Sequence, residues 1–144
     1  METIEILKKV FEQEIAAEKR YAAQISSIRK AYVIRKVLND IRKEEINHAD
    51  LVIKKIKVLD ETFDRSFTPS IIDNNFLGKD NIKEIRKFLE IDAESEKIAY
   101  TNYMNFSEQA QNLELKKMLI KFIEDEKQHE QKVLNLIDNL KRLE

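Results

Sequence analysis

The sequence predicts an all-α fold in which four long helices form one bundle. Glycine and proline occur once each in 144 residues, and apolar residues recur at helical spacing along most of the chain. Average chains contain about 7% glycine and about 5% proline, which supply the tight turns that sheet proteins need. Sandwiches, barrels, Rossmann folds and glycine-rich phosphate loops are therefore excluded.

The first half of the chain is predicted to be a helical hairpin over about residues 3–60. Its first helix runs from about residue 3 to the pair Ser26 and Ser27. Its second helix runs from about Tyr32 to Asp60. No glycine marks the turn between them, so the boundary rests on the loss of apolar periodicity.

The second half is predicted to be another hairpin, over about residues 81–143. Asp80 and Asn81 offer an N-cap for a helix that reaches about Phe106, because their side chains can accept hydrogen bonds from the first free backbone amides. Residues 107–112 then turn the chain into a last helix that ends near Leu143.

A long connection over residues 61–80 joins the hairpins and contains both Pro69 and Gly78. It lacks helical periodicity, yet it is rich in apolar side chains and is expected to pack against the bundle. These side chains are Phe63, Phe67, Ile71, Ile72, Phe76 and Leu77. With 42% apolar residues, the whole chain (residues 1–144) is expected to form a single domain.

Each predicted helix has an apolar face that contains a glutamate. The face of the last helix consists of Leu115, Leu119, Phe122, Glu126, His129, Val133, Leu136 and Leu140. That of the second consists of Ile34, Leu38, Ile41, Glu45, His48, Val52, Ile56 and Leu59. That of the first consists of Leu7, Val10, Glu14, Ala17, Tyr21, Ile25 and Ile28. That of the third consists of Ile82, Ile85, Leu89, Glu96, Ala99, Tyr103 and Phe106.

Four carboxylates on core faces need a partner, because a buried charge is unfavourable by several kcal/mol unless it is neutralised. No lysine or arginine shares these faces. Two divalent cations would balance the four negative charges, and the two histidines would add nitrogen ligands suited to iron, zinc or manganese. A glutamate and a histidine three residues apart lie on the same side of a helix.

The two halves of the chain match in register, which places the four acids in one layer. Glu96 follows Glu14 by 82 residues, as Tyr103 follows Tyr21. Glu126 follows Glu45 by 81 residues, as His129 follows His48. Because the acids of each hairpin are 31 or 30 residues apart, a chain that rises and returns at about 1.5 Å per residue brings them to one level.

These residues resemble the ferritin-like di-iron carboxylate proteins, most of all rubrerythrin-type domains. Glu14-x-x-Ala17-x-x-x-Tyr21 and Glu96-x-x-Ala99-x-x-x-Tyr103 are similar to the single-glutamate helices of that family. The segments 45–48 and 126–129 are similar to its two Glu-x-x-His helices. The resemblance covers nearly the whole chain and implies a ferritin-like bundle.

The resemblance also implies roles for the metal ligands. Glu45 and Glu126 would bridge two iron ions, with zinc or manganese as substitutes. Glu14 and His48 would complete one metal site, and Glu96 and His129 the other.

The resemblance places further residues around these ligands. Tyr21 and Tyr103 are expected to hydrogen-bond ligand carboxylates. The acid before each bridging glutamate would orient a histidine of the opposite helix, which gives the pairs Asp125–His48 and Glu44–His129.

Rubrerythrins reduce hydrogen peroxide with electrons from a cysteine-ligated rubredoxin iron. This chain has no cysteine, so the resemblance is to an erythrin domain without a rubredoxin domain, and the electron donor must be a separate partner, such as a rubredoxin-like protein. Ala99 stands where rubrerythrins carry an additional glutamate, which makes the set of four glutamates and two histidines more similar to bacterioferritin.

Three functions are therefore open. The first is a di-iron peroxidase or oxidase that acts on hydrogen peroxide or O2. The second is a ferroxidase or iron-storage protein of the ferritin or bacterioferritin type. The third is a non-catalytic helical scaffold with a structural metal.

Charge and hydropathy limit the other partners. The 26 basic and 27 acidic residues are mixed along the chain, whereas a nucleic-acid-binding surface would need clustered basic residues. No apolar run is long enough for a membrane span, and the first residues lack the pattern of a signal peptide. We expect a cytoplasmic homodimer, in which the long connection would allow hairpins to be exchanged between protomers.

Overall fold

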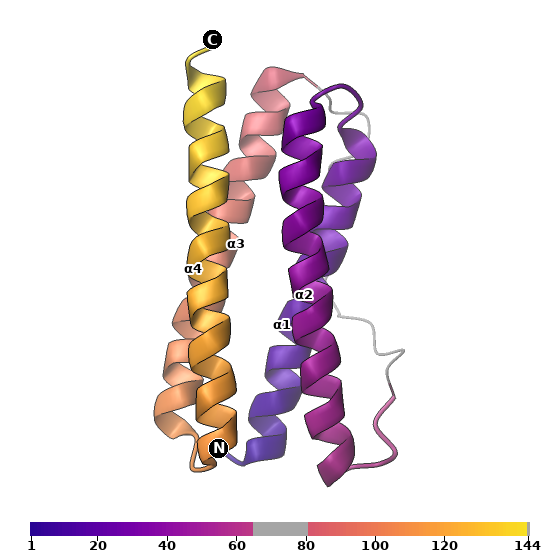
Figure 1. Cartoon of the computed structure of the whole chain (residues 1–144), viewed down its shortest axis with the longest axis vertical. Helices are drawn as coiled ribbons and strands as arrows, with labels where there is room; N and C mark the ends of the chain where they lie inside the picture. Colours follow the sequence, from indigo (N-terminus) through magenta and orange to yellow (C-terminus); the bar gives the residue numbers. More distant parts are fainter. Residues whose placement is uncertain (65–80, 144) are drawn as a thin grey trace.

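A computed structural model describes residues 1–64 and 81–143, and this part of the chain consists of four helices without strands. The helices are α1 (Thr3–Ser27), α2 (Tyr32–Leu59), α3 (Ile82–Gln109) and α4 (Leu113–Lys141). They lie side by side as one elongated bundle (Figure 1). The predicted all-α four-helix bundle is confirmed.

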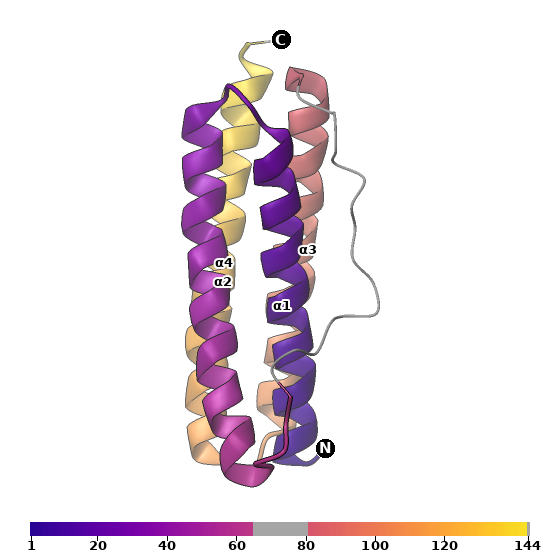
Figure 2. The same ribbon diagram turned by 90° about the vertical axis from the view of Figure 1, so that its right-hand side faces the viewer.

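Each helix packs against antiparallel neighbours. α1 forms a hairpin with α2, and α3 forms one with α4, while the two hairpins meet through α1 with α3 and α2 with α4. α2 ends at one end of the bundle and α3 begins at the other, so these two helices run parallel (Figures 1 and 2). This topology places the middle of all four helices at one level.

Two asparagines fix the starts of the helices in the second hairpin. The side chain of Asn81 accepts a hydrogen bond from the backbone N–H of Glu84 at 2.9 Å, and that of Asn112 accepts one from Leu115 at 3.0 Å. α3 continues to Gln109, three residues beyond the predicted end at Phe106. The turn is therefore only residues 110–112, because the helical bonding continues until Ala110 N–H donates to the carbonyl of Phe106.

The apolar core divides into two clusters along the bundle, one containing Tyr21 and the other containing Tyr103. The polar residues of the predicted faces lie in sequence between these clusters on every helix. Leu59 and Ile82 were expected in the core but are 55% and 42% exposed. They occupy the last turn of α2 and the first turn of α3, where fewer neighbouring helices cover the side chains.

The start of the long connection packs against the bundle as expected. The ring of Phe63 meets that of Phe11 edge to face, with centroids 5.3 Å apart. The other apolar residues expected to pack there lie outside the described residues; they are Phe67, Ile71, Ile72, Phe76 and Leu77. None of the helices described is long and apolar enough to cross a lipid bilayer.

Candidate metal centre

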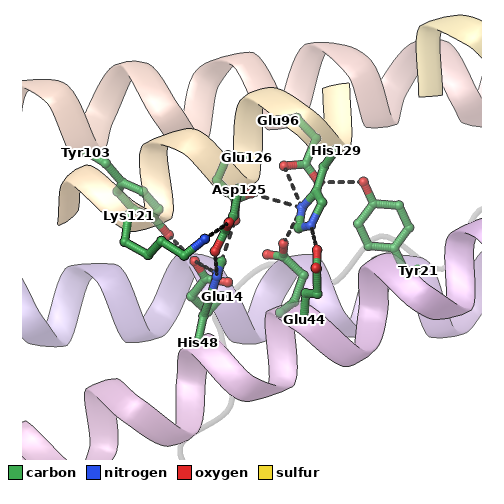
Figure 3. Close-up of polar contacts among 11 residues, drawn as sticks. Glu14, Tyr21, Glu44, His48, Glu96, Tyr103, Lys121, Asp125, Glu126 and His129 are labelled. Carbon is green, nitrogen blue, oxygen red and sulfur yellow. Dashed lines mark hydrogen bonds and ion pairs between the residues drawn. The ribbon is translucent and has the colours of Figure 1, made fainter. Parts of the chain in front are cut away.

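The structure brings together all six residues that the sequence singled out. α1 contributes Glu14 and α3 contributes Glu96, while α2 and α4 each contribute a glutamate and a histidine three residues apart, namely Glu45, His48, Glu126 and His129. All six side chains are buried, with at most 5% exposure. Figure 3 labels all of them except Glu45 and shows the labelled side chains pointing into the space between the helices.

The six residues form two overlapping groups of four. One group is Glu14, Glu45, His48 and Glu126, and the other is Glu45, Glu96, Glu126 and His129. Within each group, one ligand atom from every residue lies within 4.8 Å of the others. Glu45 and Glu126 belong to both groups, which is the arrangement expected of residues that bridge two adjacent ions.

The donor atoms fit a pair of divalent cations. One oxygen on each of the four glutamates, and Nδ1 of His129, have no hydrogen-bond partner within the described part of the chain. Nδ1 of His129 lies 2.8 Å from a Glu45 oxygen, yet neither atom forms a hydrogen bond of good geometry. Buried polar atoms normally have a hydrogen-bond partner. Five atoms that lack one and face one another suit metal ions, because a metal ion binds to the lone pairs of such oxygen and nitrogen atoms.

Outer acids orient both histidines, as predicted. Nε2 of His48 contacts Asp125 at 2.8 Å, and Nε2 of His129 contacts Glu44. Asp125 also accepts a hydrogen bond from Lys121 at 2.9 Å. A carboxylate on one ring nitrogen leaves the other nitrogen free to bind a metal, and Nδ1 of each ring faces the glutamates.

Two buried tyrosines hold the outer glutamates, again as predicted. The hydroxyl of Tyr21 donates to Glu96 at 2.5 Å, and that of Tyr103 donates to Glu14 at 2.8 Å. The tyrosine of α1 reaches the glutamate of α3, and the tyrosine of α3 reaches the glutamate of α1. This exchange follows because the two Glu-x₆-Tyr segments run antiparallel where α1 contacts α3. Each hydroxyl therefore fixes one carboxylate oxygen and leaves the other oxygen free.

In the metal-free protein this layer retains protons. Burial, together with the neighbouring charge of Glu45, raises the pKa of both Glu14 and Glu126 well above the usual value. Burial alone would also raise the pKa of Glu45, but contacts with His129 and Glu14 outweigh it and lower that pKa to about 2.

The histidines shift in the same sense. Burial alone would lower the pKa of His48 and His129, but the facing carboxylates, above all Glu126, outweigh it and raise both. Protonated imidazoles therefore partly neutralise the layer in the absence of a metal.

A second buried polar cluster lies beside Tyr21, and the sequence analysis missed it. Asp92 is fully buried and accepts hydrogen bonds from Arg20 Nε at 2.9 Å and Gln24 Nε2 at 2.7 Å. Burial raises the pKa of Asp92 to about 6, although Arg20 and Gln24 oppose this shift. A signal was present, since Asp92 and Gln24 continue the core spacing on their helices, one step from Glu96 and Tyr21.

Comparisons with known proteins agree with this geometry. No curated protein matches the sequence. A solved structure of a hypothetical protein from Pyrococcus furiosus matches all of this chain and 93% of its own, with a TM-score of 0.84 and 18% identity, which shows the shared fold. The family model described as Rubrerythrin matches residues 5–137. The chain therefore belongs to the rubrerythrin family of di-iron carboxylate proteins.

Proposed function

We propose that this protein is a di-iron oxidoreductase that reduces hydrogen peroxide, or O2, with electrons from a separate donor. The observation that supports this function best is the pair of overlapping ligand groups, which share Glu45 and Glu126 and lie in a layer closed to solvent. Membership of the rubrerythrin family supports the same metal and the same class of chemistry.

The six residues divide naturally between two ions. Glu45 and Glu126 would bridge them, Glu14 and His48 would complete one site, and Glu96 and His129 would complete the other, a list that uses every member of both groups. With two Fe²⁺ ions bound, the centre would supply the two electrons that convert one H2O2 and two protons into two water molecules. Nitrogen and oxygen donors of this kind also accept manganese or zinc.

The protein residues position the ligands and keep the reaction away from bulk water. Tyr21 and Tyr103 each hold one carboxylate oxygen, while Asp125 and Glu44 hold the outer nitrogens of the two histidines. Apolar clusters cover the layer on both sides along the bundle. Fixed ligands in a dry core limit the loss of reactive species into solvent.

The electrons are proposed to come from another protein, such as a rubredoxin-like carrier. The sequence has no cysteine, so it has no residue that could hold a rubredoxin-type iron. The donor would have to approach the outside of the bundle near the centre. We also propose a homodimer, as expected above, in which hairpin exchange through the long connection is one form of assembly.

Ferroxidase activity is the second candidate, and one position favours it. Ala99, one turn after Glu96, adds no carboxylate to the site, which leaves the nearly symmetric set of four glutamates and two histidines. Such a set would suit a ferroxidase, which uses O2 to oxidise Fe²⁺ and then releases the Fe³⁺ for storage. A cage-sized particle in size-exclusion chromatography would favour storage, and a small oligomer would favour the oxidoreductase.

One experiment separates these functions. Protein loaded anaerobically with two equivalents of Fe²⁺ is mixed with either H2O2 or O2 under an excess of a chemical reductant and a redox mediator. Repeated, stoichiometric consumption of H2O2 supports the peroxidase, whereas oxidation of added Fe²⁺ by O2 without peroxide turnover supports the ferroxidase. Binding of metal without either reaction would contradict both activities and leave the scaffold.

A further inference from the structure

The cluster of Arg20, Gln24 and Asp92 makes the two halves of the metal centre unequal. One half consists of Glu14, His48 and Tyr103, and the other consists of Glu96, His129 and Tyr21. The offset of 82 residues that relates Glu14 to Glu96 also relates Val10 to Asp92 and Gln24 to Phe106. The half containing Tyr103 therefore has apolar residues where the half containing Tyr21 has a buried carboxylate and a buried amide. The cluster is a property of one half only.

Contacts link this cluster to Glu96 in four steps. Gln24 Nε2 lies 2.7 Å from Asp92, and Asp92 lies 2.9 Å from Arg20 Nε. The guanidinium of Arg20 stacks over the ring of Tyr21, 4.8 Å from its centroid. The hydroxyl of Tyr21 donates to Glu96 at 2.5 Å. The chain of contacts thus ends on a proposed metal ligand.

The other half is built differently. The ring of Tyr103 packs among Phe106 and Phe122, with centroid distances of 6.5 and 6.3 Å. The Glu14 oxygen that accepts the hydrogen bond of Tyr103 lies 3.3 Å from Nδ1 of His48 and is hydrogen-bonded to it. In the half of Glu96, by contrast, Nδ1 of His129 lies 2.8 Å from Glu45 and 3.7 Å from the Glu96 oxygen that Tyr21 does not hold.

A structural role alone does not account for this cluster. Asp92 Oδ2 and Gln24 Oε1 are buried and lack hydrogen-bond partners within the described ranges. Unpaired buried polar atoms reduce the free energy of unfolding, and apolar residues fill the equivalent places in the other half. A cluster that lowers stability while it clamps a ligand-holding tyrosine indicates a functional role.

We propose that Arg20, Gln24 and Asp92 position Tyr21 on Glu96, so that the half containing Glu96 and His129 binds the first divalent ion more tightly. The proposal rests on the proposed metal-binding function. The clamped tyrosine fixes Glu96 before a metal arrives, and the Glu96 oxygen that Tyr21 holds is not the oxygen that faces His129. An ion entering the other half must first displace the contact between His48 and Glu14. The two ions therefore bind in order.

The test is an anaerobic titration of the metal-free protein with Co²⁺, followed by visible absorption. Wild type is expected to bind two ions in two resolved steps. Glu96→Gln should remove the tighter step, and Glu14→Gln should remove the weaker step. Asp92→Asn, which preserves side-chain volume, should weaken the tighter step about tenfold and leave the weaker one unchanged.

Two further variants separate positioning from general damage to the fold. Tyr21→Phe should weaken the same step, and adding Asp92→Asn to it should cause no further loss, since Asp92 acts through Tyr21. Glu90→Gln removes a charge from the exposed side of the same helix and should leave both steps intact. Thermal unfolding of each metal-free variant checks that the protein is folded.

Three results would overturn the inference while leaving the proposed function in place. They are two ions bound with equal affinity, equal weakening of both steps by Asp92→Asn, and additive losses in the double variant. Failure of the wild type to bind Co²⁺ at all would instead remove the proposed function and this inference together.

Discussion

Glu126→Gln should weaken both proposed ion sites, because Glu126, like Glu45, belongs to both ligand groups. The side chain is 1% exposed, and glutamine has nearly the same size and shape. The substitution removes one oxygen donor and one negative charge from both proposed ion sites. It leaves the packing of α4 unchanged.

The expected effect is large in the presence of metal and small in its absence. An ion present at about 100 times its dissociation constant stabilises the folded state by about 2.7 kcal/mol, so two ions contribute about 5 kcal/mol. For a chain of this length that corresponds to an increase in Tm of about 15 °C. Without metal, Glu126→Gln should be about as stable as wild type, because the raised pKa of Glu126 keeps its carboxyl neutral in the metal-free protein, as the glutamine amide is.

The measurement is thermal unfolding with and without Mn²⁺, monitored by circular dichroism. The wild type should gain most of this Tm increase on addition of Mn²⁺, and Glu126→Gln less than a third of it. Glu124→Gln is the matched control, since it makes the same change at an exposed position of α4. A full gain of Tm in Glu126→Gln, or a large loss of stability in its metal-free form, would refute the role assigned to this carboxylate.

Three further outcomes are expected. Metal uptake should release protons and weaken as the pH falls, because the pKa values of His48 and His129 are raised and a bound ion displaces their protons. A pH-indicator assay in weak buffer measures the released protons. Metal uptake without proton release would contradict this prediction. Tyr103→Phe should weaken metal binding about tenfold while the metal-free fold persists, as calorimetric titration can show, with unchanged affinity counting against the role of the hydroxyl. The pKa of Asp92 rises from 3.8 to about 6 on folding, so the folded state binds this proton more tightly than the unfolded state. The tighter binding adds about 3 kcal/mol to the free energy of unfolding below pH 4, and this contribution is lost as the pH rises through 6. Asp92→Asn should lack this dependence in urea unfolding of the metal-free protein, and parallel pH profiles for the two proteins would contradict it.

Periodicity and register were sufficient to predict the bundle and the six central residues. Glu45, His48, Glu126 and His129 stand on faces that are otherwise apolar, so their burial follows from the helical repeat alone. The matched offsets between the halves place all of them at one level, where the structure has them. The pairs Asp125–His48 and Glu44–His129 needed the family resemblance, because each joins two helices that are far apart in sequence.

The sequence was less informative where tertiary contacts decide the outcome. Asp92 and Gln24 share the core spacing, yet polar residues are usually solvated. Only the packing of α1 on α3 brings Asp92 to its donors Arg20 and Gln24. Leu59 and Ile82 follow the apolar pattern but lie at helix ends that the neighbouring helices do not cover. Periodicity specifies a side of a helix, whereas burial also depends on where the neighbouring helices end.

The central claim is that the layer of glutamates and histidines holds two metal ions. The most direct measurement is elemental analysis of protein purified from iron-supplemented cells, beside a variant that carries both Glu45→Ala and Glu126→Ala. We expect about two iron ions per chain in the wild type, as for a di-iron site, and none in the variant. A wild-type protein that is folded and free of metal would contradict the claim.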